Sequence, residues 1–463
     1  MSPASDPRPE AVEGGGIRLD RPLVVGLGVT GAAVAGALAR RGHDVLVVDD
    51  HPSAERRARA ESLGVTLVEA PDDELLAALV AGASVVLPSP GVPDRHPAFR
   101  AAFVHGVGVA SEFDLARMWD DRPLLAITGT DGKTTVTTMV TDMLVASGRS
   151  AVAAGNTEVP LVAAIDDPAV EVFVVEASSF RLGHTRHLHP QAATWLNFAP
   201  DHLDVHRSLD AYEAAKARVW AELDTEGGAV AVANADDPVV MRNVVPTNRT
   251  LTFSLVDPGA DYHVAGDRLE GPDAVLVDVS ALGRSLPHDL ANGLAAAATA
   301  TAGGATAEGV RATLATYQHL PHRVQLVGEH AGVRWYDDSK ATAPHATLAA
   351  LAGFDSAVLI AGGRNKGLDL GELVEATDRL RAVVAIGEAA ADVAAVFDGR
   401  RPVVVAASMA EAVDAAAGLA RPGDAVVLSP GCASFDWYGS YAARGDDFVA
   451  EVRRQVLGDG GAS

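Results

Sequence analysis

The sequence predicts an α/β protein built from several domains. Short Val-rich runs alternate with Ala-rich segments along most of the chain, the pattern expected when amphipathic helices connect buried parallel strands. The chain has 463 residues, which favours about three domains of roughly 150 residues each. Hydrophobic residues make up 48% and charged residues 21% of the chain, so a substantial core can be buried.

Ten apolar runs are predicted to form the strands of this fold. Each run ends near Gly, Pro, Ser, Asp or Asn, the residues that most often interrupt regular structure. The predicted strands are residues 23–26, 44–49, 84–88, 124–128, 172–176, 192–196, 229–233, 357–361, 382–386 and 425–429. The Ala-rich stretch 294–302 is predicted to be helical. The Gly- and Asp-punctuated segment 250–283 is predicted to add antiparallel strands at a sheet edge.

Polar segments that contain proline indicate the seams between domains, near residues 120–123 and 320–323. We therefore expect domains at 1–119, 120–319 and 320–463. The first twenty residues are rich in Pro, Gly and acidic side chains and lack the apolar run of a signal peptide. Residues 1–20 are expected to form a flexible tail. The apolar stretches are far shorter than the roughly 20 residues that span a bilayer, so no membrane insertion is expected.

Charge and cysteine content narrow the function classes. The 37 Lys and Arg residues against 61 Asp and Glu residues give a net charge of −24, which disfavours nucleic-acid binding through phosphate neutralisation. A single cysteine, Cys432, permits no intrachain disulfide and no Cys-rich metal cluster. A reducing cytoplasm is the expected compartment.

The first strand runs into a glycine-rich turn at residues 26–31, which is followed by an Ala-rich helix. This G-x-G-x-x-G spacing brings backbone amides close to a pyrophosphate. The next strand ends at Asp49, near the position of a ribose-binding acid in dinucleotide-binding domains. Local sequence leaves three interpretations open: an NAD-type site, a site for a nucleoside diphosphate such as UDP, and a tight turn without a ligand.

A second turn has the features of a phosphate loop. The predicted strand 124–128 leads into Gly129, and Gly132-Lys133-Thr134 then opens a helix. Amides at the helix start would face a polyphosphate, the Lys133 ammonium would approach its β- and γ-phosphates, and the Thr134 hydroxyl would reach Mg²⁺. The loop is a shortened type, because Ile127 replaces the first glycine of the usual pattern. We predict ATP binding here.

Two further features can be explained with or without a functional role. The turn at 362–367 follows an apolar strand and contains Lys366, which could bind an anionic group or be a solvated lysine. Cys432 lies in a Gly-Cys-Ala-Ser turn and could be a nucleophile, but no His/Asp constellation is evident beside it. We therefore predict a packed thiol.

Carboxylates and histidines after two central strands point to a metal. Glu176 ends its strand at the carboxyl edge of the sheet, where parallel sheets bind ligands and where an oxygen donor beside a triphosphate suits Mg²⁺. The segment 197–206 holds two His and two Asp residues in its last six positions. It could be a zinc site or a loop without a ligand, and we favour His202 as a second Mg²⁺ ligand.

These motifs together resemble the Mur ligases, the ATP-dependent amide-forming enzymes of peptidoglycan precursor synthesis. The resemblance extends from Gly26 to Phe448, and its motifs occur in the family's order. They are residues 26–31, 89–91, 128–135, 155–156, 176–180, 201–202, 216, 234–237, 320–323, 338–342, 362–367 and 429–436. The resemblance implies a Rossmann-like N-terminal domain, a P-loop ATPase central domain and a Rossmann-like C-terminal domain. The resemblance also favours a UDP site over an NAD-type site at the turn of residues 26–31.

Roles are implied for residues in the first two domains. The UDP part of the substrate would be held by Val29, Thr30, Asp49, Ser89, Pro90, Gly91 and Asn156. ATP would be held by Gly129, Thr130, Asp131, Gly132, Lys133, Thr134, Thr135, Asn292, Arg323 and Asp338. Two Mg²⁺ ions would involve Thr134, Glu176, His202 and Lys216. Sequence physics alone makes Lys216 a surface helix lysine; the resemblance matches it to a lysine that is carbamylated and thereby supports the second ion.

The C-terminal domain would bind the amino acid. The motif at 429–436 resembles the branch that adds D-glutamate to UDP-N-acetylmuramoyl-L-alanine, and the implied D-glutamate residues are Thr342, Lys366, Ser434 and Phe435. Lys340 would contact the reacting phosphate. Four residues depart from the family pattern and bear on nucleotide affinity: Asp131, Asp289, Ala343 and His51.

The implied reaction transfers the γ-phosphoryl group of ATP to the L-alanine carboxylate, and the D-glutamate amine then attacks the acyl phosphate. The catalytic residues would be Lys133, Glu176, His202, Lys216 and Lys340, acting through positioning and positive charge. The C-terminal domain is expected to close over the central one, and the protein is expected to be a monomer. The alternatives are a folylpolyglutamate-like or cyanophycin-like ligase and a catalytically silent nucleotide-binding module.

Overall fold

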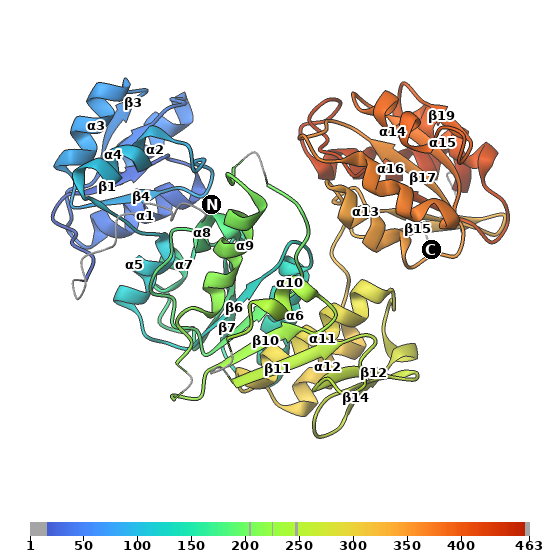
Figure 1. Ribbon diagram of the computed structural model, residues 1–463, viewed down its shortest axis with the longest axis horizontal. Helices are drawn as coiled ribbons and strands as arrows, with labels where there is room; N and C mark the ends of the chain where they lie inside the picture. The colour runs from blue at the N-terminus through green and yellow to red at the C-terminus, as the bar shows by residue number, and fades with distance from the viewer. Residues whose placement is uncertain (1–15, 203–204, 225, 246–248, 459–463) are drawn as a thin grey trace, which may run out of the picture.

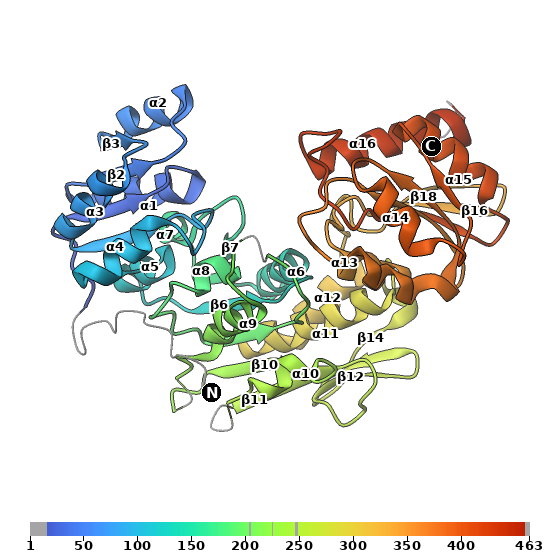
Figure 2. The same ribbon diagram turned by 45° about the horizontal axis from the view of Figure 1, so that its top comes forward.

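The computed structural model describes residues 16–202, 205–224, 226–245 and 249–458. Within these residues the strands form three β-sheets, which contain strands β1–β5, β6–β14 and β15–β20. We refer to the three parts as the first, central and last lobes. Figures 1 and 2 show the first and last lobes on opposite sides of the molecule, with the central lobe joining them.

The first lobe is a parallel sheet in the order β3-β2-β1-β4-β5. Its strands are β1 (Pro22–Val25), β2 (Leu46–Asp49), β3 (Thr66–Glu69), β4 (Val85–Pro88) and β5 (Gly108–Val109). Its helices are α1 (Val29–Arg40), α2 (Ala54–Leu63), α3 (Asp73–Gly82), α4 (Pro97–His105) and α5 (Glu112–Trp119). The strand order reverses between β1 and β4, and open parallel sheets bind ligands at such a switch point.

The expected tail at residues 1–20 is wrong for its last part. Leu19 is buried in the core of the first lobe, and Ile17 packs against the same core. The Ser84 hydroxyl donates to the Arg18 carbonyl over 2.8 Å. Apolar burial therefore fixes residues 17–20, and residues 1–15 of the expected tail lie outside the described residues.

The central lobe has the sheet order β14-β13-β12-β11-β10-β9-β6-β8-β7. Its strands are β6 (Leu124–Thr128), β7 (Ala151–Gly155), β8 (Val172–Glu176), β9 (Ala192–Trp195), β10 (Val230–Asn234), β11 (Arg249–Ser254), β12 (Tyr262–Ala265), β13 (Arg268–Glu270) and β14 (Val275–Asp278). Its helices are α6 (Lys133–Ala146), α7 (Leu161–Ala164), α8 (Ser179–Leu182), α9 (Leu209–Ala217), η1 (Arg218–Trp220), α10 (Pro238–Arg242), η2 (Val279–Ala281), α11 (Pro287–Ala302) and α12 (Ala307–Thr316).

Side chains alternate between two cores on the faces of the central sheet, as the pleat requires. Leu125 and Ile127 of β6 face one core, and Leu124 and Ala126 face the other. The predicted antiparallel addition at 250–283 is only partly correct. Strands β12, β13 and β14 pair antiparallel, but β11 runs parallel to β10, and β12 runs parallel to β11.

The last lobe has the sheet order β15-β16-β20-β17-β18-β19. Its strands are β15 (Gln325–His330), β16 (Val333–Asp337), β17 (Ala357–Gly362), β18 (Leu380–Ile386), β19 (Val403–Val405) and β20 (Ala425–Leu428). Its helices are α13 (Pro344–Leu351), η3 (Leu370–Arg379), α14 (Ala390–Phe397), α15 (Met409–Leu419), α16 (Tyr441–Val452) and η4 (Arg453–Leu457). Strand β15 is antiparallel to β16, and the remaining neighbours are parallel.

The ten predicted strands and the predicted helix at 294–302 are confirmed, the helix as part of α11. The segment 120–123 lies between α5 and β6, and the segment 320–323 lies between α12 and β15. Within the described part of the chain, no helix is both long enough and apolar enough to cross a lipid bilayer.

Candidate active site

A cavity of about 590 Å³ lies at the switch point of the first sheet. All seven residues expected around the uridine diphosphate line it: Val29, Thr30, Asp49, Ser89, Pro90, Gly91 and Asn156. The turn at 26–31 is packed tightly, because a Cβ atom on Gly31 would lie 1.9 Å from the Gly26 carbonyl oxygen. The Ser89 hydroxyl donates to that same oxygen over 2.7 Å. We call this cavity the first-lobe pocket.

Asp49 organises the wall of the first-lobe pocket. Its carboxylate accepts hydrogen bonds from the backbone amides of Leu27 at 2.7 Å and His51 at 2.9 Å, and from the Arg56 guanidinium at 2.5 Å. Burial disfavours the charged carboxylate, but these donors together hold the pKa of Asp49 below its usual range. Sequence reasoning missed Arg56, although its position in the first turn of α2, seven residues after Asp49, was a usable signal.

The second turn has the local geometry of a phosphate loop. It joins the central strand β6 to α6, and Gly132 caps the helix at a φ of +82°. A Cβ atom on Gly132 would lie 2.5 Å from Oδ1 of Asn292, so only glycine fits. The Asn197 side chain accepts hydrogen bonds from the amides of Thr130 and Asp131, both at 2.9 Å, and fixes the loop from the neighbouring strand end.

Two lysines meet at one carbonyl of this loop. Nζ of Lys133 donates to the Gly129 carbonyl over 2.9 Å and to the Thr130 carbonyl over 2.8 Å, and Nζ of Lys216 donates to the same Gly129 oxygen over 2.5 Å. Burial lowers the pKa of Lys133, while the Glu176, Asp131 and Asp201 carboxylates oppose that shift. Burial and the Lys133 charge hold the pKa of Lys216 well below its usual value.

Sequence physics alone suggested that Lys216 is a surface lysine. The structure shows that it is buried. It is 1% exposed, and its ammonium lies 4.6 Å from the centre of the Tyr212 ring. Helix α9 brings Lys216 to the phosphate loop across 87 residues of sequence. A lowered pKa favours the uncharged form of a lysine, which is the form that reacts as a nucleophile.

Glu176 at the end of β8 is buried and only partly satisfied. Its Oε1 accepts a 2.9 Å hydrogen bond from the Asn156 side chain. Its Oε2 is also buried and has no hydrogen-bond partner among the described residues. A buried carboxylate oxygen without a donor is unfavourable unless a cation or donor joins it. Glu176 thus has a free ligand atom for a hard metal ion.

His202 lies on the loop after β9, at a φ of +57°. Its ring packs against Phe180 with 4.8 Å between centroids, and its Nε2 lies 3.4 Å from Oδ2 of Asp201. Asp201 in turn acts electrostatically on Lys133 and Lys216, so this loop borders the phosphate loop. Asp204 of the same predicted cluster lies outside the described residues.

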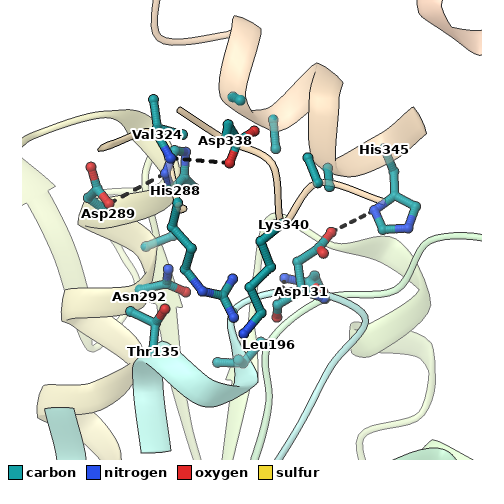
Figure 3. Close-up of a pocket in the computed structure, with 18 of the residues that line it drawn as sticks. Asp131, Thr135, Leu196, His288, Asp289, Asn292, Val324, Asp338, Lys340 and His345 are labelled. Carbon is teal, nitrogen blue, oxygen red and sulfur yellow. Dashed lines mark hydrogen bonds and ion pairs between the residues drawn. The ribbon is translucent and has the colours of Figure 1, made fainter. Parts of the chain in front are cut away.

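A second cavity, of about 290 Å³, lies between the central and last lobes. We call it the interlobe pocket. Six of the residues expected around ATP line it: Asp131, Gly132, Thr135, Asn292, Arg323 and Asp338. The other four, Gly129, Thr130, Lys133 and Thr134, belong to the same loop and helix start. Figure 3 shows the Lys340 side chain extending from the last lobe toward the phosphate loop, between Asn292 and Asp131.

Burial shifts the ionisation of two residues from the last lobe. Burial and the nearby Arg323 guanidinium lower the pKa of Lys340 to about 8, against the opposing charge of Glu176. Burial raises the pKa of Asp338 to about 7, although the Ser429 hydroxyl donates to it over 2.7 Å. Nε of Arg323 is buried without a hydrogen-bond partner among the described residues. The charges of Lys340 and Asp338 and the unpartnered Nε of Arg323 are therefore placed to interact with an anion in the pocket.

Two of the four departures from the family pattern, Asp131 and Asp289, have ion-pair partners in the structure. Oδ2 of Asp131 accepts a 2.6 Å hydrogen bond from Nδ1 of His345, which links the central and last lobes. Although burial opposes it, His345 and Lys133 hold the pKa of Asp131 at about 2. Asp289 pairs with Arg284 through two 2.6 Å contacts. His51 lines the first-lobe pocket, and Ala343 precedes α13.

The residues expected around D-glutamate follow the carboxyl ends of three adjacent parallel strands, β16, β20 and β17. Thr342 follows β16, Lys366 follows β17, and Ser434 and Phe435 follow β20. Backbone hydrogen bonds join these segments, since Gly431 donates to Ala341 over 3.0 Å and Arg364 and Ala433 bond to each other. Ser434 is buried, whereas Lys366 and Phe435 are exposed.

Cys432 lies among these segments as a packed thiol, as predicted. It is buried in the core of the last lobe, and burial raises its pKa to about 12. A thiol in this state is a poor nucleophile.

Arg181 was missed by sequence reasoning, although it directly follows the motif at residues 176–180. Its buried guanidinium donates to Oε1 of Glu112 at 2.8 Å, to Oδ1 of Asn156 at 2.7 Å and to Oγ1 of Thr30 at 2.8 Å. Asn156 donates in turn to Glu176. Because Thr30, Asn156 and Arg181 line the first-lobe pocket, this network joins that pocket to the candidate metal ligand.

Comparisons with known proteins match all three lobes. Residues 20–111 match the model of the Mur ligase MurD-like N-terminal domain, residues 127–300 the Mur ligase middle domain, and residues 322–432 the glutamate ligase domain of Mur ligases.

Similar full-length proteins are also known. The chain is 43% identical to a UDP-N-acetylmuramoylalanine--D-glutamate ligase of Frankia casuarinae, over 93% of both chains. It is 38% identical to a protein of the same name from Desulfosudis oleivorans, over 94% of this chain and 97% of the relative. A pseudomurein peptide ligase type C from Methanothermus fervidus has a similar fold, with a TM-score of 0.58 and 17% identity, over 94% of this chain and all of that one.

Proposed function

The chain belongs to the Mur ligase family, and we propose that it joins D-glutamate to UDP-N-acetylmuramoyl-L-alanine, using ATP, in peptidoglycan precursor synthesis. Relatives that share 43% and 38% of its residues carry the name of that ligase. The reaction is the formation of an amide from a free carboxylate, which needs activation of the carboxylate by phosphoryl transfer.

The position of Glu176 between the two pockets supports this reaction most directly. Its Oε1 is bonded to Asn156, which lines the first-lobe pocket. Its charge also acts on Lys133 at the phosphate loop and on Lys340 in the interlobe pocket. A UDP-linked carboxylate from one side and the terminal phosphate of ATP from the other would therefore meet beside Glu176.

We propose that ATP enters the interlobe pocket. The amides of the phosphate loop and the Lys133 ammonium would hold the polyphosphate, and Asn292, Arg323 and Asp338 would contact the nucleoside. Lys340 would approach the transferring γ-phosphoryl group from the last lobe. Because positive charge placed in advance stabilises the oxygens of the transferring group, catalysis rests on positioning and electrostatics.

The metal ligands fit magnesium. The unpartnered Oε2 of Glu176 offers an oxygen ligand, and the proposed set is completed by Thr134, His202 and a carbamate on Lys216. Such a carbamate forms when the uncharged Lys216 amine attacks CO₂ and loses a proton, which replaces a repelling ammonium by an oxygen ligand. When bound there, Mg²⁺ neutralises phosphate charge and polarises the reacting oxygens.

The proposed reaction has two chemical steps. The L-alanine carboxylate attacks the γ-phosphorus of ATP, ADP leaves, and an acyl phosphate forms. The D-glutamate amine then attacks the acyl carbon, phosphate leaves, and the amine gives up its proton. Thr342, Lys366, Ser434 and Phe435 are proposed to hold D-glutamate, since they follow three adjacent strand ends on one sheet edge. We also propose that the protein works as a monomer in the cytoplasm.

A phosphate-release assay with a panel of amino acids tests the proposal. The purified chain receives ATP, Mg²⁺ and UDP-N-acetylmuramoyl-L-alanine, and each amino acid is added separately. Phosphate release is expected with D-glutamate and not with L-glutamate, L-lysine or diaminopimelate. The Lys133→Ala variant, prepared in parallel, reports contaminating ATPase activity. Release that is independent of the UDP-sugar, or that responds to another amino acid, contradicts the proposal.

A further inference from the structure

Three metal-ligating side chains meet on the surface of the central lobe, apart from the phosphate loop. His187 and His189 lie between α8 and β9, and Glu222 follows η1. Nδ1 of His187 is 3.3 Å from Oε1 of Glu222, and Nε2 of His189 is 3.3 Å from Oε2. The potential ligand atoms of the three residues all lie within 4.8 Å of one another.

The backbone holds the two histidines in place. Leu188 between them is buried in the core of the central lobe, and the His187 amide donates to Oδ1 of Asp114 over 2.7 Å. His189 has a φ of +45°, a conformation that non-glycine residues adopt at a cost. The two imidazole rings lie nearly parallel, with 6.1 Å between centroids and 16° between planes. Both rings are thereby presented to the same carboxylate.

The contacts of the two histidines with Glu222 are longer than those of a hydrogen-bonded ion pair. Charge-assisted N–H···O bonds measure about 2.7–2.9 Å, whereas both N···O distances here are 3.3 Å. Oε2 of Glu222 is buried and has no hydrogen-bond partner among the described residues. Two ligands at about 2.0–2.1 Å from a tetrahedral metal are separated by about 3.3–3.4 Å. Each histidine nitrogen lies at that distance from one oxygen of Glu222, His187 from Oε1 and His189 from Oε2, and all the potential ligand atoms lie within 4.8 Å of one another.

We propose that His187, His189 and Glu222 bind a divalent transition metal of the zinc type, with the fourth position open to water. Two imidazole nitrogens and one carboxylate oxygen suit Zn²⁺ better than Mg²⁺ or Ca²⁺, which take oxygen ligands. Binding places a dication beside the Glu222 carboxylate, between the two imidazoles. This site uses none of the residues assigned to the ligase reaction.

The position of the site suggests a structural role. Nε of Arg218, in η1, donates to the Thr185 carbonyl over 2.9 Å, so the loop that carries the histidines already contacts the end of α9. A metal shared by this loop and Glu222 adds a second connection on the other side of η1. Because α9 carries Lys216, the metal would hold the base of the lysine that reaches the phosphate loop.

Equilibrium dialysis of the full chain against Zn²⁺ tests the proposal. An excess of Mg²⁺ is included to occupy the oxygen-rich site at the phosphate loop. The wild type is expected to bind one more equivalent of zinc than the His187→Gln/His189→Gln variant. The control variant His330→Gln, which removes an exposed histidine on the last lobe, should bind as the wild type does. Equal stoichiometry in the wild type and the double variant overturns the proposal.

Two more measurements separate a built site from loose adsorption. Glu222→Gln should weaken zinc binding by at least about 10-fold. Co²⁺ should give the intense visible absorption of four-coordinate cobalt in the wild type but not in the double variant, and weak octahedral bands in both overturn the proposal. The histidine side chains are 57% and 56% exposed, so the double variant should fold and retain phosphate release.

Discussion

Replacing Arg181 by methionine tests the network that joins the first-lobe pocket to Glu176. Methionine keeps most of the apolar stem but removes the guanidinium, which donates to Glu112, Asn156 and Thr30. The Arg181 and Glu112 side chains are 5% and 1% exposed. The substitution therefore leaves a carboxylate buried without its cation, the most costly way to break an ion pair.

The size of the effect follows from these contacts. Breaking a buried pair by removing one partner costs about 3–5 kcal/mol of stability. In the Arg181→Met/Glu112→Gln variant no unpaired charge remains, and the loss reduces to the hydrogen bonds to Asn156 and Thr30, about 1 kcal/mol each. The double variant should therefore be more stable than the single variant by about 1–3 kcal/mol.

The effect should also depend on pH in one direction. Burial already raises the pKa of Glu112 above its usual value of 4.5, although Arg181 opposes the shift. Without Arg181 the folded-state pKa rises further. A group with a raised folded-state pKa contributes stability that is complete below the unfolded pKa and is lost as the pH rises through the folded value. The Arg181→Met variant should thus be most destabilised at neutral and alkaline pH and approach the double variant in acid.

Urea unfolding followed by tryptophan fluorescence measures this difference. Trp195 and Trp220 share the central core with Phe113 and Leu182, which neighbour Glu112 and Arg181 in sequence. Arg149→Met is the matched control, because it removes the cation of the surface pair with Glu171, a type worth about 0–1 kcal/mol. The reasoning is refuted if Arg181→Met unfolds at the same urea concentration as this control, or if the double variant is no more stable than the single.

Three further outcomes are expected. The value of kcat/KM should fall as the pH rises through about 8, where Lys340 loses its charge, and Lys340→Arg should move the fall to higher pH; a pH–rate profile that is flat through this range contradicts the assignment. Glu176→Gln should raise the Mg²⁺ concentration needed for half-maximal phosphate release by at least about 10-fold, whereas the surface variant Glu171→Gln should leave it unchanged. Cys432, buried with a pKa of about 12, should resist iodoacetamide in the folded protein and react after unfolding, as mass spectrometry can show; full modification of folded protein contradicts its burial.

Sequence reasoning found most of the strands that are buried on both faces, but it missed β16, whose buried residues are interrupted by the exposed Arg334. Strands such as β6 and β17 consist of residues with essentially no exposed surface, so they appear as short continuous apolar runs. It missed β3 and β15, in which exposed and half-buried residues predominate. An edge strand contributes little to the core, and its composition then resembles that of a loop.

In the candidate site, too, some residues could be predicted from the sequence and others could not. Lys133, Glu176 and Asp49 follow strand ends within recognisable local motifs, so their places could be predicted. The partner of Asp131 could not, because His345 lies 214 residues away and neighbours it only after two lobes meet. No local pattern reports a contact of that kind.

The carbonyl oxygen of Gly129 has a further consequence, because it accepts hydrogen bonds from two ammonium groups at once. A carbonyl oxygen carries only a partial negative charge, so it balances two ammonium groups poorly, and the Lys133 charge favours loss of the proton from Lys216. Conversion of Lys216 to the proposed carbamate would remove this repulsion and leave Lys133 as the cation at this carbonyl. The crowding of like charges thus favours the modification of Lys216.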